Sequence, residues 1–259
     1  MGLTRLWGLL KPGGPGLATH RRQILRDNVP LSRILPQAEG ERLERLVGDF
    51  LDRKHFEGCH GLKVTEEMRV TVAGYACLLL LRDPVGDFPQ LGTVVVYPES
   101  FAAPIRSANH VGIVTETVEE RLGESWREGT VVLTWDSIRE IIAGMSGDCN
   151  VIIHEFAHQI DARRGLTDGA PLLALRGRYR DWDDLLPAEQ RRQRTALRRG
   201  RPASLDAYAF TSAEELFAVA TECFYMRPVR FRNSHPELHA ELQAVYGVDP
   251  AAWVLSAEC

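Results

Sequence analysis

The spacing of hydrophobic and polar positions predicts two helices in the first third of the chain. In residues 38–57, apolar side chains recur every three or four positions between charged neighbours, which is typical of an amphipathic helix. Gly58 follows this run as a stop signal. Thr65, with two glutamates after it, is typical of a helix start, and residues 68–81 are apolar enough for a helix buried on most sides.

The pattern then changes from helical spacing to short β-branched runs. Residues 92–98 (GTVVVYP) and 129–135 (GTVVLTW) are bounded by glycine or proline, which predicts two strands. Residues 110–119 have weaker strand character. With so few strands, the sheet is expected to be small.

Helical signals return after the second strand and continue to the end of the chain. Asp136 is expected to cap a short helix through Ile142, and Asn150 is expected to cap the next helix. Residues 212–226 and 235–247 are the clearest later helices, and the second has proline in its first turn and glycine at its end. These elements predict an α+β fold that is mainly helical.

Composition and complexity favour one domain. The 259 residues are 44% hydrophobic and 25% charged, which is ordinary for a globular protein. No internal repeat or low-complexity segment divides them, so we expect a single domain over residues 21–259. Residues 1–20 are expected to be a loose tail, because the apolar patch Leu6–Leu10 is too short for a secretory signal. No run approaches the roughly 18 apolar residues of a membrane span.

Charge and cysteine content narrow the expected partners and compartment. The formal net charge of −4 gives no general reason to expect direct nucleic-acid binding. The five cysteines form no CxxC pair, and an odd number spread this widely favours reduced thiols. We therefore expect a cytoplasmic protein with no membrane partner.

The stretch NVIIHEFAHQID, residues 150–161, contains an HExxH motif within an apolar helix. His154 and His158 are four residues apart and project from one helix face, with Glu155 beside them. Zinc binds imidazole nitrogens, and a catalytic site needs three protein ligands with one position left to water. The metal lowers the pKa of that water towards about 7, and an adjacent glutamate is placed to take its proton.

A structural pair of histidines is the alternative for this motif, but burying two imidazoles and a carboxylate without a partner would be costly. The third ligand of a zinc site must come from elsewhere in the chain. The pattern HExxHxxGxxH is absent, because Asp161 and Arg164 replace its glycine and last histidine.

The later helix at 212–226 supplies candidate acids with two interpretations each. Glu215 is a candidate ligand, or it completes a capping box with Ser212, and Glu214 suits an exposed first turn. Glu222 is either a buried carboxylate paired with an arginine or an acceptor that fixes the tautomer of a ligand histidine. Asp161 has the same two interpretations, and spacing alone leaves them open.

Several stretches resemble one known family. NVIIHEFAHQID, DGAPLL, YAFTSAEELFAVATECFY, LGTVVVYPESF and GESWREGTVVLTWDSI are similar to the Mlc titration factor A family of zinc-dependent peptidases. The resemblance covers about residues 30 to 245. The catalytic core of that family is similar to the metallopeptidase domain of anthrax lethal factor.

The resemblance implies a complete set of site residues. In the family a tyrosine stands seven positions before the glutamate ligand, which here selects Tyr208 and Glu215. His154, His158 and Glu215 would then bind one zinc ion per chain, with Glu155 as general base. Tyr208 would hydrogen-bond the developing oxyanion, a role that other donors fill elsewhere.

We therefore expect an α+β zincin-type metallopeptidase, mainly helical, with a small β-sheet next to the HExxH helix. The resemblance implies aminopeptidase-type cleavage of a peptide or protein substrate, and binding of an Mlc-like repressor of sugar uptake, so that any effect on DNA is indirect. One alternative is a non-catalytic, zinc-containing binding protein that sequesters a transcription regulator. Another is a structural zinc site closed by Glu222 or Asp161 as a fourth ligand.

Three other features have less certain roles. The arginines at 191–201 could select acidic substrates or bind a partner, although a solvated helix and loop is the favoured interpretation. The strand at 129–135 could be an edge strand that pairs with substrate, or an internal strand. His110, His235 and His239 have no partners at ligand spacing and are expected to be ordinary surface or core residues.

Overall fold

The computed structural model describes residues 16–83, 85–99, 101–108, 114–121, 123–126, 129–147, 149–162, 179–200 and 204–257. The first elements are α1 (Thr19–Asn28), the 3₁₀ turn η1 (Pro30–Arg33), α2 (Gln37–Arg53), β1 (His55–Gly58) and α3 (Glu66–Leu78). The middle elements are β2 (Thr93–Tyr97), β3 (Phe101–Ala108), β4 (Val114–Arg121), β5 (Gly123–Trp126), β6 (Thr130–Thr134), α4 (Trp135–Ile142) and α5 (Val151–Asp161). The last elements are α6 (Tyr179–Arg198), the 3₁₀ turn η4 (Ala207–Phe210), α7 (Ala213–Met226), α8 (Pro228–Ser234), α9 (Pro236–Tyr246) and α10 (Pro250–Ala257).

The N-terminal helices follow the predicted pattern, with one correction. Thr65 caps α3 as predicted, because its hydroxyl accepts a hydrogen bond from the backbone N–H of Met68. The amphipathic helix α2 was predicted to run to residue 57 but ends at Arg53, because the following residues form strand β1 and pair with β2. Gly58 therefore ends a strand, where a Cβ would lie 2.0 Å from the carbonyl oxygen of Leu62.

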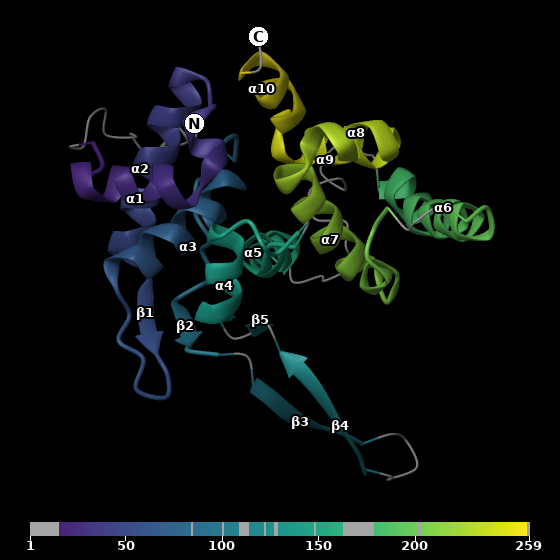
Figure 1. The fold of residues 1–259 in the computed structure, drawn as a ribbon, viewed down its shortest axis with the longest axis horizontal. Helices are drawn as coiled ribbons and strands as arrows, with labels where there is room; N and C mark the ends of the chain where they lie inside the picture. Colours follow the sequence, from purple (N-terminus) through teal and green to yellow (C-terminus); the bar gives the residue numbers. More distant parts are fainter. Residues whose placement is uncertain are drawn as a thin grey trace, which may run out of the picture.

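The main sheet has the order β1-β2-β6-β5. The first three strands are parallel, whereas β5 runs antiparallel to β6. Strands β3 and β4 form a separate antiparallel pair (Figure 1). The two predicted strands are confirmed as β2 and β6, and β4 covers part of the weaker stretch. The edge-strand interpretation of β6 is wrong for the described residues, because β6 lies between β2 and β5.

The N-cap residue differs from the prediction in α4 and agrees with it in α5. Asp136 does not cap α4: Thr134 stands at that position, and Asp136 lies within the first turn. Asn150 caps α5 as predicted, because its side-chain oxygen accepts a hydrogen bond of 3.1 Å from the backbone N–H of Ile153. Ser212 caps α7 by accepting one of 3.2 Å from the backbone N–H of Glu215.

Helix α5 lies in the middle of the molecule, between the N-terminal helices and α7 (Figure 1). The fully buried ring of Phe156 on α5 contacts Phe50 and Phe88, with ring centroids 5.7 and 4.9 Å apart. The core continues through α7 to α9, where Phe224 packs against Tyr246. The predicted α+β fold, mainly helical with a small sheet beside the motif helix, is confirmed.

Most of the predicted tail, residues 1–15, lies outside the described residues, and α1 begins at Thr19. Among the helices that the structure describes, none combines the length and hydropathy that crossing a membrane would require.

Candidate metal centre

Three predicted side chains meet where α5 packs against the start of α7. His154 and His158 lie one turn apart on α5, and Glu215 lies in the first turn of α7. The Nε2 atoms of the two histidines are 3.2 Å apart. Glu215 places Oε2 3.1 Å from Nε2 of His154 and Oε1 3.6 Å from Nε2 of His158. Within the described ranges, these three form the one group of three or more His, Cys, Asp or Glu side chains whose ligand atoms converge.

These distances fit a tetrahedral ion. Ligand atoms at about 2.0–2.1 Å from zinc are separated from one another by roughly 3.3–3.4 Å in a tetrahedron, close to the three separations above. The buried Oε2 atom of Glu215 has no hydrogen-bond partner, although it lies 3.1 Å from Nε2 of His154. A metal ion would satisfy this oxygen. The donor set of two imidazoles and a carboxylate therefore fits zinc.

Glu222, two turns along α7 from Glu215, fixes the orientation of His154. Its Oε1 atom lies 2.7 Å from Nδ1 of His154, and its Oε2 atom accepts a hydrogen bond from the backbone N–H of Asn150. The side chain is buried. Because Nδ1 of His154 donates to a carboxylate, its Nε2 atom faces His158 and Glu215, where a metal ion would replace the Nε2 proton.

The electrostatics of the group favour a cation. Burial by itself would lower the pKa of His154, but the carboxylates of Glu215 and Glu222 outweigh it and raise that pKa to about 10. Burial by itself would raise the pKa of Glu215, but the two histidines hold it well below its usual range. With Glu155 also contributing negative charge to His154, three carboxylates surround two imidazoles, an excess that a divalent cation would balance.

Glu155 and Asp161 are both buried on α5, and neither joins the group of converging ligand atoms. Glu222 is likewise absent from that group, since its oxygens are directed at His154 and Asn150. Within the described residues the group has three members, which leaves a tetrahedral ion a fourth position.

Tyr208 comes to the same place from η4. The carboxylate of Asp206 accepts a hydrogen bond of 2.8 Å from the Tyr208 backbone N–H and so starts the turn. The ring of Tyr208 lies 6.1 Å from the ring of His154, tilted by 36°. The side chain is 52% exposed, so solvent reaches Tyr208 beside the ring of His154.

Residues 14–247 match the sequence profile of the glucose-regulated metallo-peptidase M90 family. The chain belongs to the M90 family. The uncharacterized protein slr2042 of Synechocystis sp. is 33% identical over 235 residues, which cover 90% of this chain and 86% of that protein. Mlc titration factor A of Cronobacter sakazakii is 31% identical over 225 residues, covering 86% and 84% of the two chains. That of Yersinia pestis is 30% identical over 250 residues, covering 95% and 90%.

These findings confirm the resemblance to the Mlc titration factor A family. Membership of a metallo-peptidase family implies a divalent metal, typically zinc, and the converging atoms of His154, His158 and Glu215 are suited to hold one.

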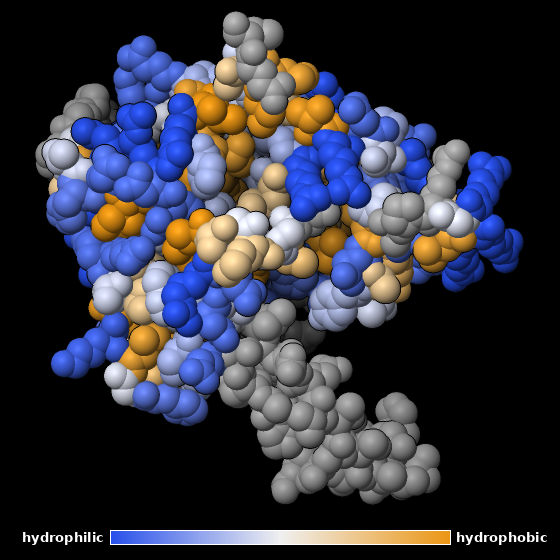
Figure 2. All heavy atoms as spheres, viewed as in Figure 1, coloured by the Kyte–Doolittle hydropathy of each residue, from blue (hydrophilic) through white to orange (hydrophobic). Residues whose placement is uncertain are grey.

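Four of the arginines predicted at 191–201 lie on α6; Arg199 follows the helix, and Arg201 lies outside the described residues of this M90 chain. Arg191, Arg192 and Arg199 line an open surface hollow, and hydrophilic side chains gather at this end of α6 (Figure 2). Arg192 is 3.4 Å from the buried carboxylate of Glu189. This arrangement agrees with the favoured interpretation of a solvated helix.

Of His110, His235 and His239, two are core residues and one is not described. His239 is buried 3.4 Å from Asp249, and His235 is buried 2.7 Å from Glu189. His110 lies outside the described residues. Sequence reasoning missed the pairing of His235 with Glu189, since the two are 46 positions apart and no periodicity links them.

Proposed function

We propose that this M90 chain is a zinc-dependent metallopeptidase that hydrolyses peptide bonds by an aminopeptidase-type cleavage. The observation that carries the proposal is the convergence of His154, His158 and Glu215, whose ligand atoms lie 3.1 to 3.6 Å apart. These three residues would hold one zinc ion per chain. When bound, zinc supplies a Lewis acid that polarises a substrate carbonyl and lowers the pKa of water to about 7.

Three residues of the chain would have separate roles in this reaction. Glu155 follows His154 directly on α5, and its carboxylate would take a proton from the attacking water and return it to the leaving amine. The phenol of Tyr208 would donate a hydrogen bond to the oxyanion that develops on the substrate carbonyl. Glu222 would keep the tautomer of His154 that offers Nε2 to the metal.

Strand β5 is the element best placed to bind substrate in extended form. It is the last strand of the described sheet, antiparallel to β6, and it lies against α5. An extended peptide could add, through backbone hydrogen bonds that tolerate different side chains, to the edge of β5 that no described strand pairs with. The pairing role first considered for β6 therefore passes to β5.

The names of the relatives support a regulatory partner. Several are called Mlc titration factor A, and we propose that this chain, in the cytoplasm, binds an Mlc-like repressor of sugar-uptake genes. The same names favour a second candidate, a non-catalytic protein that titrates a regulator while its metal site only maintains the fold.

A Glu155→Gln variant separates the two candidates, with Glu140→Gln on α4 as a matched control. Zinc content and cleavage would be measured on peptide libraries with free and with blocked N-termini. We expect wild type and both variants to bind one zinc, and cleavage by Glu155→Gln to fall by about 10²-fold or more, because the general base is lost.

An aminopeptidase would cleave the free N-termini and spare the blocked ones. Equal cleavage by Glu155→Gln and wild type would exclude Glu155 as the base. Zinc binding without cleavage by any of the proteins would favour the titrating protein, and repressor capture by Glu155→Gln would then be the decisive measurement.

A further inference from the structure

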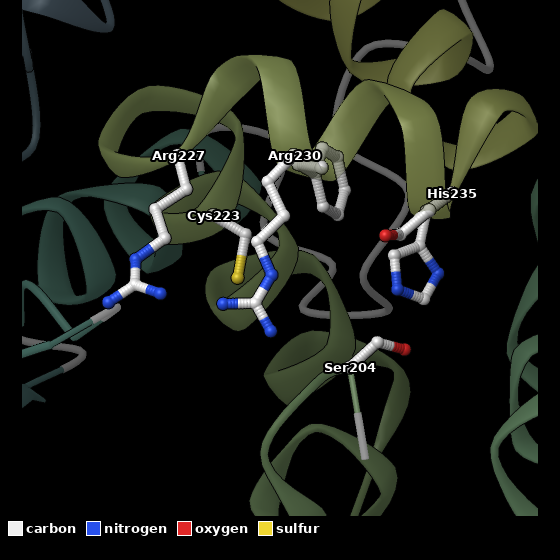
Figure 3. A pocket seen from close by; sticks show the side chains of 7 residues that line it. Ser204, Cys223, Arg227, Arg230 and His235 are labelled. Carbon is white, nitrogen blue, oxygen red and sulfur yellow. The ribbon is translucent and has the colours of Figure 1, made fainter. Parts of the chain in front are cut away.

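The segment at residues 204–210 leads into η4, the turn that carries Tyr208, and two of its sides differ in how they are held. Ser204, at the start of the segment, faces Cys223 and His235 across a small pocket (Figure 3). The contact on that side is therefore not close-packed. The hydrogen bonds that helix α6 makes from another side gain importance for the same reason.

Gln193 on α6 pairs with the backbone of Leu205 through both ends of its amide. Its Nε2 atom donates to the carbonyl oxygen of Leu205 at 2.9 Å, and its Oε1 atom accepts from the Leu205 backbone N–H at 3.4 Å. Both residues are buried. One side chain thus meets both backbone groups of Leu205, as a residue of a neighbouring antiparallel strand would. This fixes the position of Leu205 relative to α6.

Helix α6 can act as an anchor because its buried face is tied to the core one turn earlier. Glu189, four residues before Gln193, places Oε2 2.7 Å from Nδ1 of His235, and both side chains of that pair are buried. A second glutamine of α6, Gln190, donates from Nε2 to the carbonyl oxygen of Phe210 at 3.5 Å. The two glutamines therefore contact the segment near its two ends.

The backbone between these two contacts is short and internally hydrogen-bonded. The carboxylate of Asp206 accepts a hydrogen bond of 2.8 Å from the Tyr208 backbone N–H, and its carbonyl oxygen accepts one of 3.2 Å from that of Ala209. The hydroxyl of Thr211 donates to the carbonyl oxygen of Tyr208 at 2.8 Å. Tyr208 is three positions after Leu205, so a shift of Leu205 would be passed on to the backbone of Tyr208.

Tyr208 needs a firmly held backbone because its side chain is half-exposed, and fewer neighbours hold its ring than would hold a core residue. The ring lies 6.1 Å from that of His154. A donor to a developing oxyanion acts at about 2.7–3.1 Å from the position of that oxygen. A displacement of about 1 Å can cost on the order of 100-fold in rate.

We propose that Gln193 is a positioning residue, whose paired amide and Leu205 backbone hold η4 where the phenol of Tyr208 can serve the metal centre. The inference rests on the role proposed for Tyr208 above. Gln193 itself would touch neither the substrate nor the metal, and its effect on the reaction would be made through Tyr208 alone.

The first test is a double-mutant cycle between Gln193→Leu and Tyr208→Phe, with steady-state peptide cleavage by the zinc-loaded full chain. We expect Gln193→Leu to lower kcat about tenfold with KM and zinc content unchanged, because leucine makes neither hydrogen bond to Leu205. In the Tyr208→Phe background the same change should have no further effect on kcat, because no phenol remains to be positioned. Gln243→Leu, at an exposed position of α9, is the control and should match wild type.

The second test is hydrogen exchange of the backbone amides at residues 204–211, which does not depend on catalysis. We expect Gln193→Leu to raise exchange in this segment at least about tenfold, because the Leu205 N–H loses its acceptor and the turn loses its anchor. The amides of α5 should exchange as in wild type. Gln190→Leu should raise exchange in the same segment by a smaller factor of about three, and it keeps the test available if Gln193→Leu does not fold.

Equal loss of kcat on Gln193→Leu in both backgrounds would overturn the inference, since Gln193 would then act on the fold as a whole. Unchanged exchange at residues 204–211 would also overturn it, because the amide pair would not be holding the turn. Wild-type kcat in Gln193→Leu would overturn this inference alone, whereas wild-type kcat in Tyr208→Phe would overturn the proposed role of Tyr208 as well. If wild type cleaved no peptide, the proposed function would fail, and exchange would decide whether Gln193 holds the turn.

Discussion

Two histidines in this molecule are held in the same way and face different surroundings. His154 on α5 and His235 between α8 and α9 each place Nδ1 2.7 Å from a buried glutamate oxygen, of Glu222 and Glu189 respectively. In both pairs the carboxylate fixes the ring and leaves Nε2 directed away from it. The difference lies in what converges on Nε2.

Around His154 the converging groups are a second imidazole and the carboxylate of Glu215, which together favour a cation. Around His235 no second ligand atom converges among the described residues, and its buried Nε2 atom makes no hydrogen bond. The comparison teaches that a histidine–carboxylate pair supplies orientation, whereas the groups opposite Nε2 decide whether a metal ion can bind.

Removing the carboxylate charge of Glu215, which faces Nε2 of His154, should have the largest effect on the metal centre. In Glu215→Gln the metal centre loses its anionic ligand, and we expect zinc affinity to fall more than about 100-fold, beyond the range seen when outer partners are changed. Peptide cleavage should disappear with the zinc. Glu214→Gln, in the same helical turn but outside the converging group, is the control and should retain zinc as measured by metal analysis after dialysis. Equal zinc in both variants would remove Glu215 from the ligand set.

Replacing the phenol beside His154 should leave metal binding intact and slow the chemistry. We expect Tyr208→Phe to lower kcat by about 10²-fold, because one oxyanion donor is lost, with zinc content unchanged. Steady-state kinetics that separate kcat from KM provide the measurement. A change confined to KM would indicate that Tyr208 contacts the substrate without donating to the oxyanion. We expect no oxyanion donor to act beside His235, so the effect should be confined to the metal centre.

Replacing the glutamate of one histidine–glutamate pair at a time should give the smallest effects, each confined to the surroundings of one histidine. In Glu222→Gln we expect zinc affinity to fall about 10–100-fold, because the amide holds the tautomer of His154 less firmly than the carboxylate. Glu189→Gln should leave zinc affinity unchanged, because His235 is outside the converging group, and should lower the midpoint of thermal unfolding, because the buried pair loses a charge-assisted hydrogen bond. Competition titration with a chelator measures zinc affinity, and thermal unfolding measures the second effect. If both variants lost zinc equally, the pairs would be supporting the fold and not separate sites.

Much of the molecule could be predicted from local sequence because local interactions produce it. The helix cap at Asn150, the strands β2 and β6, and the stop at Gly247 with its φ of 69° follow from neighbouring residues alone. The end of α2 could not be predicted, because residues 55–58 leave the helical pattern to pair with β2, a contact made across 38 positions of the chain. The position of His154 and His158 on one helix face likewise follows from their spacing of about one helical turn.

What the sequence by itself determined is therefore the pair His154 and His158, the adjacent Glu155 and, through a family resemblance, the candidates Glu215 and Tyr208. The tertiary structure alone decided that Glu215 faces the histidines while Glu222 orients His154, and that Glu189 meets His235. The physical reason is that the packing of α7 and α6 against the rest of the core sets which carboxylate reaches which imidazole. Those contacts join residues 46 to 68 positions apart, where no periodicity in the sequence records them.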